Sequence, residues 1–395
     1  MSTRPGGMYS NTPPIHTTKP IDAPGALVGR VLDGRYQLNS IMSTGGMGII
    51  FEATQLSVSR RIAVKILRPT LANDVDLLQR FSQEVEVVAS ISHPNIVALI
   101  DAGQDATGLM FLVMEFIKGE TFRDALKSSR LKLVDIIEVF MQICEALGEA
   151  HAIGIIHRDL KFDNIMLQER HDQRLHIKIL DFGVAKLLTR NVNLTRGGQI
   201  PGTPGIIAPE LVAMKDPSPQ SDLYSLGVLL FTALTGQAPF QGKNDLELMH
   251  AHQFEPVPDI TPLVQSYTPE PLVELVKELM SKEPSNRPHD AMAVRRRLET
   301  IQRTLQSEHR DLPAYVPPLF EKDHDIFGSG AFRLQPGQAA QLDDFEGIEL
   351  PREVKLKPSK QPLLVVPASV VTMLALVLLV LCVILLYMLR GLLFG

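Results

Sequence analysis

"HRDLKFDNIM", residues 157–166, is the stretch that decides the fold. Asp159 and Asn164 lie five residues apart in it, and Lys161 stands between them. A carboxylate can accept a proton, a lysine supplies positive charge, and carboxylate or amide oxygens are ligands that suit Mg²⁺. The stretch therefore predicts a loop that brings a base, a cation and a metal ligand to one place.

Further motifs stand at regular places on both sides of this loop. Downstream, "KILDFGVAK" places Asp181 seventeen residues after Asn164, and "APE" occupies residues 208–210. Upstream, "IAVKIL" places Lys65 in an apolar run that is typical of a strand, and Glu84 follows nineteen residues later in a helical pattern. The interpretation depends on the order of these motifs rather than on any one of them.

A glycine-rich stretch precedes them. Residues 42–53, "MSTGGMGIIFEA", place Gly45, Gly48 and Ile50 at the spacing of a loop that covers phosphates, but Ser43 stands where the first glycine is expected. Taken alone, the stretch is either a nucleotide clamp or a flexible turn between two strands, because short glycine motifs recur by chance.

In this order, the motifs resemble those of the protein kinase family over about residues 36–304. The sequences "GGMG", "HPNIV" and "YSLGVLLFTALTGQAPF" resemble those of bacterial Ser/Thr kinases of eukaryotic type. The resemblance implies an α+β, two-lobed protein kinase fold over residues 34–304, with a β-rich lobe that carries one helix (34–118) and a mostly helical lobe (119–304). The sequence pattern agrees, since short runs of branched residues precede residue 119 and helical periods follow it.

The resemblance implies which residues bind ATP and its metal. Lys65 would hold the α- and β-phosphates, and Glu84 would pair with Lys65 to orient it. Asn164 and Asp181 would each bind Mg²⁺, with Mn²⁺ as an alternative. The glycine-rich strands, the hinge and the floor of the cleft would contribute Met42, Ser43, Gly45, Gly46, Gly48, Ile50, Ala63, Met114, Glu115, Ile117 and Met166.

The resemblance also implies how a protein substrate is handled. Asp159 would accept the proton of the substrate hydroxyl or orient that group. Lys161 would steady the γ-phosphate, in the form typical of Ser/Thr rather than tyrosine kinases. Thr203 would contact Lys161 and Asp159 and shape the substrate pocket. At residues 205–207, "GII" departs from the aromatic residue and methionine that are usual there, which concerns substrate preference rather than catalysis.

The segment between Gly183 and Ala208 corresponds to the activation loop of the family. Arg158, directly before the expected base, is typical of kinases in which a phosphate on this loop pairs with that arginine. Thr189 and Thr195 are either regulatory phosphosites or ordinary exposed loop residues. The resemblance thus predicts regulation by autophosphorylation, with a homodimer as a route to transfer between two copies.

An active enzyme and a pseudokinase scaffold are the two competing functions. A pseudokinase commonly lacks the lysine, the catalytic aspartate or the metal-binding aspartate. The presence of all the expected polar residues favours catalysis: Lys65, Glu84, Asp159, Asn164 and Asp181. The sequence therefore predicts a Ser/Thr protein kinase that transfers the γ-phosphate of ATP to Ser or Thr hydroxyls of proteins.

The two ends of the chain have different compositions. Residues 1–33 are rich in Pro, Gly, Ser and Thr and predict a disordered leader, and residues 305–361 read as a linker. From Leu363 to Leu389 no charged residue occurs over 27 positions, which predicts a membrane-spanning helix at 362–389 and a short external tail at 390–395. Positive residues before the span place the kinase domain in the cytoplasm, anchored in the inner membrane: Arg352, Lys355, Lys357 and Lys360.

Composition narrows the class of protein and its partners. The net charge of −5 argues against a generic nucleic-acid binder, which usually carries a basic surplus. Only two cysteines occur, so no disulfide framework is implied. The acidic stretch at 342–349 is a solvated part of the linker or a docking peptide for a partner.

Other polar residues are assigned to the architecture. Asp222 resembles the helix residue that hydrogen-bonds the backbone of the catalytic loop, and Glu210 with Arg287 resembles the buried ion pair of the helical lobe. His250 and His252 are two residues apart and do not share a helix face, so the sequence does not predict a metal site there.

Overall fold

The computed structural model describes residues 19–20, 24–45, 48–67, 85–169, 175–182, 203–308, 315, 331–332 and 349–350. They belong to one compact unit, Thr17–Leu350; the other unit, Met1–His16 with Pro351–Gly395, lies outside the described residues. Within the described ranges, no helix combines the length and apolar character that crossing a membrane requires. The predicted membrane segment at 362–389 lies outside these ranges and stays a prediction.

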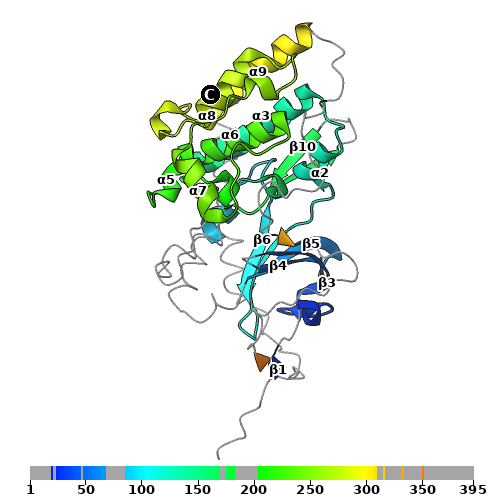
Figure 1. Ribbon diagram of the computed structural model, residues 1–395. Coiled ribbons are helices and arrows are strands. Elements are labelled where there is room, and N and C mark those ends of the chain that lie inside the picture. The colour runs from blue at the N-terminus through cyan, green and yellow to red at the C-terminus, as the bar shows by residue number, and fades with distance from the viewer. Residues whose placement is uncertain are drawn as a thin grey trace, which may run out of the picture. The chain divides into compact units, whose positions relative to one another are not determined.

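The N-terminal lobe is an antiparallel sheet with the strand order β11-β3-β4-β5-β7-β6, and β2 also pairs with β3. Alternate side chains such as Phe51 and Val64 enter its core, because successive residues of a strand face opposite sides. Figure 1 shows β3, β4 and β5 together, with the helices gathered at the other end. The strands are β2 (Val31–Leu32), β3 (Tyr36–Gly45), β4 (Gly48–Gln55), β5 (Arg60–Leu67), β6 (Leu99–Gln104), β7 (Met110–Glu115) and β11 (Ala331–Phe332).

Shorter elements complete this lobe. A 3₁₀ turn, η1 (Pro24–Leu27), precedes β2 and inserts Leu27 into the sheet core. The disordered leader predicted for residues 1–33 is therefore wrong for residues 24–33, because Leu27 and Leu32 are buried in this core. A helical stretch at residues 85–89 lies between β5 and β6 in the chain. The two-residue strands β1 (Lys19–Pro20) and β12 (Glu349–Leu350) pair with each other.

The C-terminal lobe is mostly helical, with a small antiparallel sheet of order β10-β9-β8. Its helices are α2 (Phe122–Lys127), α3 (Leu133–Ala152), α5 (Pro209–Val212), α6 (Pro219–Thr235), α7 (Asp245–Phe254), α8 (Glu270–Leu279) and α9 (Ala291–Glu308). The strands are β8 (Glu120–Thr121), β9 (Ile165–Glu169) and β10 (Leu175–Ile179), and the 3₁₀ turns are η3 (Phe162–Asn164), η5 (Pro204–Ile206), η6 (Thr261–Leu263) and η7 (Pro284–Asn286).

Helix α6 forms the centre of this lobe. Every residue from Ser221 to Thr235 is buried, as expected for a helix that is apolar on all sides. It begins with Ser218 as N-cap and Pro219 in its first turn, and it ends at Gly236 in the left-handed conformation (φ 78°). A Cβ atom on Gly227 would lie 2.7 Å from the Cβ atom of Leu279, so glycine lets α6 approach α8 closely.

These observations confirm the predicted two-lobed α+β fold. The last helix continues to Glu308, four residues past the predicted domain end at 304. Tyr315 is also buried against the helical lobe: its backbone N–H donates to Leu131 O (2.6 Å) and its hydroxyl donates to Leu234 O (2.7 Å). The chain therefore still contacts this lobe inside the segment that the sequence assigns to a linker.

Candidate active site

The catalytic loop at residues 157–166 is held by Asp222 of helix α6. The two oxygens of this buried carboxylate accept hydrogen bonds from the backbone N–H groups of His157 (2.8 Å) and Arg158 (2.9 Å). His151 Nε2 lies 2.8 Å from the same carboxylate. Burial alone would raise the pKa of Asp222, but its contacts with His151 and His157 lower it, so the carboxylate stays charged. The predicted contact between Asp222 and the loop backbone is confirmed.

Asp159 is fixed by groups from three directions. Lys161 Nζ lies 3.1 Å from Asp159 Oδ2, and the Thr203 hydroxyl donates to Asp159 Oδ1 at 2.8 Å. The amide of Asn164 donates to the backbone carbonyl of Asp159 at 2.9 Å. This hydrogen bond uses the amide nitrogen of Asn164, so the amide oxygen is the atom of this side chain that suits a metal ion. The structure thus brings together four residues that the sequence assigns to catalysis, metal binding and the substrate pocket.

Lys65 of β5 contacts Asp181, which follows β10. Lys65 Nζ lies 2.8 Å from Asp181 Oδ2, and the lysine is almost buried. Asp181 adopts a left-handed backbone conformation (φ 56°). Glu84, the partner that the sequence assigns to Lys65, lies outside the described residues. A cation from the sheet and a predicted metal ligand from the helical lobe therefore meet in one place.

The segment that carries Asp181 is attached to the catalytic loop. Leu180 N–H donates to Asn164 O at 2.8 Å, and His157 Nε2 lies 3.1 Å from Leu180 O. The rings of His157 and Phe182 meet edge to face, with centroids 4.7 Å apart. These contacts set Asn164 and Asp181, the two predicted metal ligands, on adjoining backbone segments.

The glycine-rich residues form the hairpin β3–β4. Ser43 pairs with Ile50 and Gly45 pairs with Gly48 in its register. Gly48 has φ 153°, and a Cβ atom there would lie 2.1 Å from the backbone oxygen of Ile66. Glycine is therefore required at position 48 by the approach of β5, whereas Ser43, which follows an irregularity in the β3–β4 register, has no positive φ that would favour glycine. Gly46 lies outside the described residues.

One face of the sheet carries the expected nucleotide contacts. Ile50 pairs directly with Lys65, and Ala63 lies two residues before Lys65, so the three side chains share a face. That face is opposite to the core, which contains Phe51 and Val64 from the same strands. These positions suit the predicted roof of an adenine pocket.

Glu115 lies at the end of β7, where the chain leaves the sheet. Its carboxylate accepts hydrogen bonds from Ala98 N–H (2.8 Å) and from Lys178 Nζ (2.6 Å). The side chain and the backbone N–H of Glu115, which donates to Ala98 O at 3.0 Å, are both engaged within the protein, so a base would contact other backbone groups of this segment. Met114 and Ile117 beside it are buried, and Met166 lies in β9.

The segment after the activation loop is tied to the helical lobe. Ser225 Oγ donates to Ile206 O at 2.8 Å. Arg287 donates to both oxygens of Glu210 at 2.8 Å, and both side chains are buried. Burial alone would raise the pKa of Glu210, but the hydrogen bonds and charge of Arg287 lower it. The predicted buried ion pair is confirmed, whereas Thr189 and Thr195 lie outside the described residues.

Comparison with known proteins agrees with this geometry. The family model described as "Protein kinase domain" matches residues 36–298. The chain belongs to the protein kinase family. Serine/threonine-protein kinase pkn3 of Myxococcus xanthus is 33% identical over 279 residues, which cover 69% of this chain and 51% of that protein. PknA of Mycobacterium tuberculosis H37Rv is 36% identical over 265 residues, which cover 66% of this chain and 59% of that protein. The chain thus spans about half the length of the curated relatives it matches.

Solved structures show the same fold. The crystal structure of the Mycobacterium tuberculosis PknI kinase domain matches with a TM-score of 0.54 at 20% sequence identity, over 69% of this chain and 98% of that domain. At this level of identity the likeness concerns the fold alone.

Two side-chain contacts of the kinase domain carry no local sequence signal. His151 reaches Asp222 from helix α3, 71 residues away in the chain. Arg123 of α2 donates to both oxygens of Asp163, 40 residues away, at 2.9 and 2.8 Å. Asp163 is visible in the sequence as an acidic residue inside the catalytic motif, but its partner is found only in the fold.

His252, one of the two histidines of helix α7, is a buried packing residue of the kinase domain. Its Nδ1 lies 3.0 Å from the Tyr224 hydroxyl, and burial lowers its pKa to about 3. Among the residues that the structure describes, no group of three or more His, Cys, Asp or Glu side chains could hold a metal ion. The family's metal needs no such group, because Mg²⁺ is commonly bound by one or two protein ligands together with substrate phosphates.

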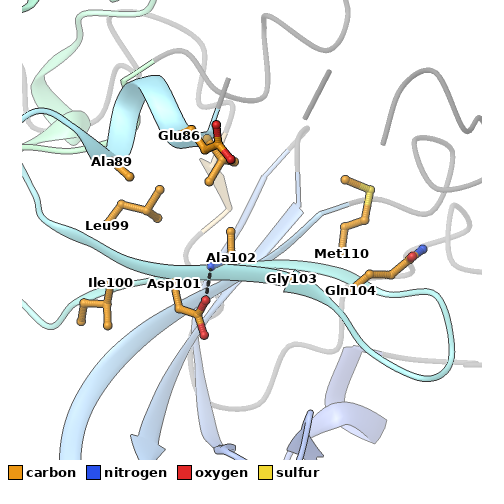
Figure 2. A pocket seen from close by; sticks show the side chains of 10 residues that line it. Glu86, Ala89, Leu99, Ile100, Asp101, Ala102, Gly103, Gln104 and Met110 are labelled. Atoms are coloured by element: carbon orange, nitrogen blue, oxygen red, sulfur yellow. Dashed lines mark hydrogen bonds between the residues drawn. The ribbon is translucent and has the colours of Figure 1, made fainter. Parts of the chain in front are cut away.

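A cavity of about 460 Å³ lies away from the catalytic loop, beside the sheet edge formed by β6. Figure 2 shows Glu86 and Ala89 of the helical stretch facing the side of β6 that carries Leu99 and Ala102. None of the predicted nucleotide or catalytic residues is among those that line it: Val85, Glu86, Ala89, Leu99, Ile100, Asp101, Ala102, Gly103, Gln104 and Met110.

Proposed function

We propose that the chain is an active Ser/Thr protein kinase that transfers the γ-phosphate of ATP to Ser or Thr hydroxyls of proteins. The observation that carries the proposal is the fixed position of Asp159 between Lys161 and Thr203. Phosphoryl transfer needs little covalent chemistry from the protein and depends mainly on positioning and charge. A loop that holds a carboxylate and a cation 3.1 Å apart provides both.

The chain's own residues divide the work as follows. Asp159 orients the substrate hydroxyl and receives its proton on a carboxylate oxygen, while Lys161 beside it supplies positive charge near the transferred phosphate. Lys65 supplies a second, almost buried cation for the other phosphates.

ATP with Mg²⁺ fits the residues present. Asn164 and Asp181 offer an amide oxygen and a carboxylate on adjoining backbone segments, which is the donor set that Mg²⁺ takes together with phosphates. When bound, the metal supplies charge that neutralises the phosphates. Mn²⁺ has similar ligand preferences and is the alternative.

Labelled ATP and Mg²⁺ test the proposal on the purified full chain. The wild type should label itself or a generic protein substrate, and Asp159→Asn and Lys65→Ala should not. Lys277→Ala, which changes an exposed lysine remote from the loop, is the matched control and should behave like the wild type. If the wild type incorporates no more label than Asp159→Asn, the chain is a pseudokinase scaffold instead.

We further propose that the chain is anchored in the inner membrane by residues 362–389, with the kinase domain in the cytoplasm. The support is the run of 27 residues without charge and the positive residues before it. The full chain should stay with membranes after a carbonate wash, and a chain that ends at residue 361 should be released. Release of both would exclude a spanning helix.

Regulation by autophosphorylation is proposed for the same loop that contains Thr189 and Thr195. Mass spectrometry of the labelled chain should find phosphate at one of these positions. If transfer occurs between two copies, the specific rate of labelling rises with protein concentration; a constant specific rate would count against a homodimer.

A further inference from the structure

An ion pair stands directly beside the catalytic residues. Arg123 donates to Asp163 Oδ1 through Nε at 2.9 Å and to Oδ2 through Nη2 at 2.8 Å. Asp163 lies four residues after Asp159 and immediately before Asn164, inside the 3₁₀ turn of the catalytic loop. Asp163 thus belongs to the same loop as the predicted base.

The pair continues a row of alternating charges. Lys161 stands two residues before Asp163 in the same loop, and Lys161 Nζ is 3.1 Å from Asp159 Oδ2. The order is therefore Arg123, Asp163, Lys161 and Asp159, from the helical lobe to the base. With Arg123 in place, the carboxylate of Asp163 is neutralised at the edge of the site.

The position of Arg123 is fixed by packing. Helix α2 is capped by Thr121, whose hydroxyl accepts from Asp124 N–H at 3.1 Å. The next residue, Phe122, is fully buried and packs edge to face against Phe162, with ring centroids 5.4 Å apart. The contacts between α2 and the turn η3 hold the arginine and its partner together; in Figure 1, α2 lies in the helical lobe.

The two side chains differ in their access to solvent. The side chain of Asp163 is 37% exposed, whereas that of Arg123 is 13% exposed. A substrate side chain can therefore reach this carboxylate. A basic residue there would need the same two oxygens that Arg123 occupies, because a guanidinium binds a carboxylate through two parallel hydrogen bonds.

We propose that Arg123 is a specificity-determining residue, which masks Asp163 so that the kinase does not select substrates with a basic residue near the phosphorylated hydroxyl. The inference rests on the proposed kinase activity. Removal of the arginine leaves an accessible carboxylate in the catalytic loop, and an arginine of the substrate then takes the vacated place.

The experiment compares peptides on the purified full chain. Each peptide carries one acceptor serine in a neutral background, with a single Arg or a single Gln placed in turn at each position on either side of it. Steady-state kcat/KM is measured for the wild type, Arg123→Gln and the double variant Arg123→Gln/Asp163→Asn. Arg130→Gln, which breaks the ion pair with Glu120 in the same lobe, is the matched control.

The wild type and Arg130→Gln should treat Arg and Gln peptides alike, within about threefold. For Arg123→Gln, kcat/KM should be about tenfold or more higher for the Arg peptide than for the Gln peptide at one position. A charge-assisted pair of this kind changes binding by at least about tenfold. The double variant should lose that preference, because its carboxylate is gone. Thermal unfolding and kcat/KM for the Gln peptides show whether each variant is folded.

Several results would overturn the inference. A wild type that already favours Arg, an Arg123→Gln variant with a flat profile, or a preference that persists in the double variant would each contradict masking. A wild type that labels no peptide would instead refute the proposed kinase activity, and the inference would fall with it. The two failures are distinguished by the rate on the Gln peptides.

Discussion

Replacing Arg287 by alanine should destabilise the helical lobe by about 3–5 kcal/mol, because the carboxylate of Glu210 then stays buried without its cation. The exposed fractions of the two side chains are 0% for Arg287 and 5% for Glu210. The guanidinium donates to both carboxylate oxygens at 2.8 Å. Apart from this cation, the Ser221 hydroxyl donates to the same carboxylate, and it carries no compensating charge.

Other hydrogen bonds of Arg287 place the expected destabilisation by Arg287→Ala toward the upper end of this range of about 3–5 kcal/mol. The guanidinium also donates to the carbonyls of Ser281 (2.8 Å), Gln220 (2.8 Å) and Lys282 (3.0 Å). A buried acceptor left without a partner costs about 1–3 kcal/mol unless water replaces the donor. Since single domains are stable by about 5–15 kcal/mol, the variant loses a large share of its stability.

Urea unfolding of the wild type, Arg287→Ala, Arg287→Met, Glu210→Gln and the double variant Glu210→Gln/Arg287→Met measures the free energies. The double variant removes both charges, so its cost should be smaller than the sum of the costs of Arg287→Met and Glu210→Gln. A cost below about 1 kcal/mol for Arg287→Ala, or strictly additive single costs, would refute the reasoning.

The same pair gives a pH dependence with a definite sign. Arg287 holds the pKa of Glu210 below its usual value in the folded protein. A carboxyl group with a depressed folded pKa contributes stability above its unfolded pKa of about 4.3 and loses it as the pH falls through the folded value. In Arg287→Ala, burial without the cation raises the pKa of Glu210, so the stability difference between wild type and Arg287→Ala should shrink as the pH falls, beginning above the ordinary Glu pKa of about 4.3. A difference that does not change with pH would show that charge is not its cause.

Three further predictions concern the nucleotide and the catalytic loop. Gly48→Ala should raise KM for ATP by about tenfold or more in steady-state kinetics, because the added Cβ atom meets the Ile66 oxygen at 2.1 Å. Ser43→Gly should change the same KM by less than about tenfold, since Ser43 has no positive φ that would favour glycine; a larger shift would contradict this. Asp159→Asn should lower kcat by about 10²–10⁴-fold while ATP binding, measured by calorimetry, stays within about twofold of the wild type. A parallel loss of ATP affinity would mean that Asp159 supports the fold of the cleft instead.

The catalytic loop was predictable because its residues are close in sequence and similar in order to those of a known family. Asp159, Lys161 and Asn164 lie within one short segment, so the local backbone alone brings them together. The contact of Thr203 with Asp159 spans 44 residues and followed from the resemblance rather than from spacing.

The contacts that the sequence did not indicate join residues from distant elements. Arg123 and Asp163 each stand in an ordinary helical or turn pattern, and neither pattern indicates that the two residues form an ion pair. Tyr315 likewise follows the last helix among Pro residues that suggest a linker. Its hydroxyl nevertheless donates a hydrogen bond to Leu234 O of the helical lobe at 2.7 Å. Such pairs depend on how helices pack, which local periodicity does not encode.

The two lobes support the site in different ways. The backbone of the catalytic loop is hydrogen-bonded to Asp222 of α6, which is buried from Ser221 to Thr235. The core of the helical lobe therefore holds the loop that carries Asp159. Preorganised charges of this kind cost no rearrangement when the reaction occurs. The contact of Lys65 with Asp181, in contrast, is an ion pair between two groups that the nucleotide and its metal would each engage separately. The helical lobe therefore fixes Asp159 through α6, whereas the Lys65–Asp181 pair joins a strand of the sheet to the segment after β10.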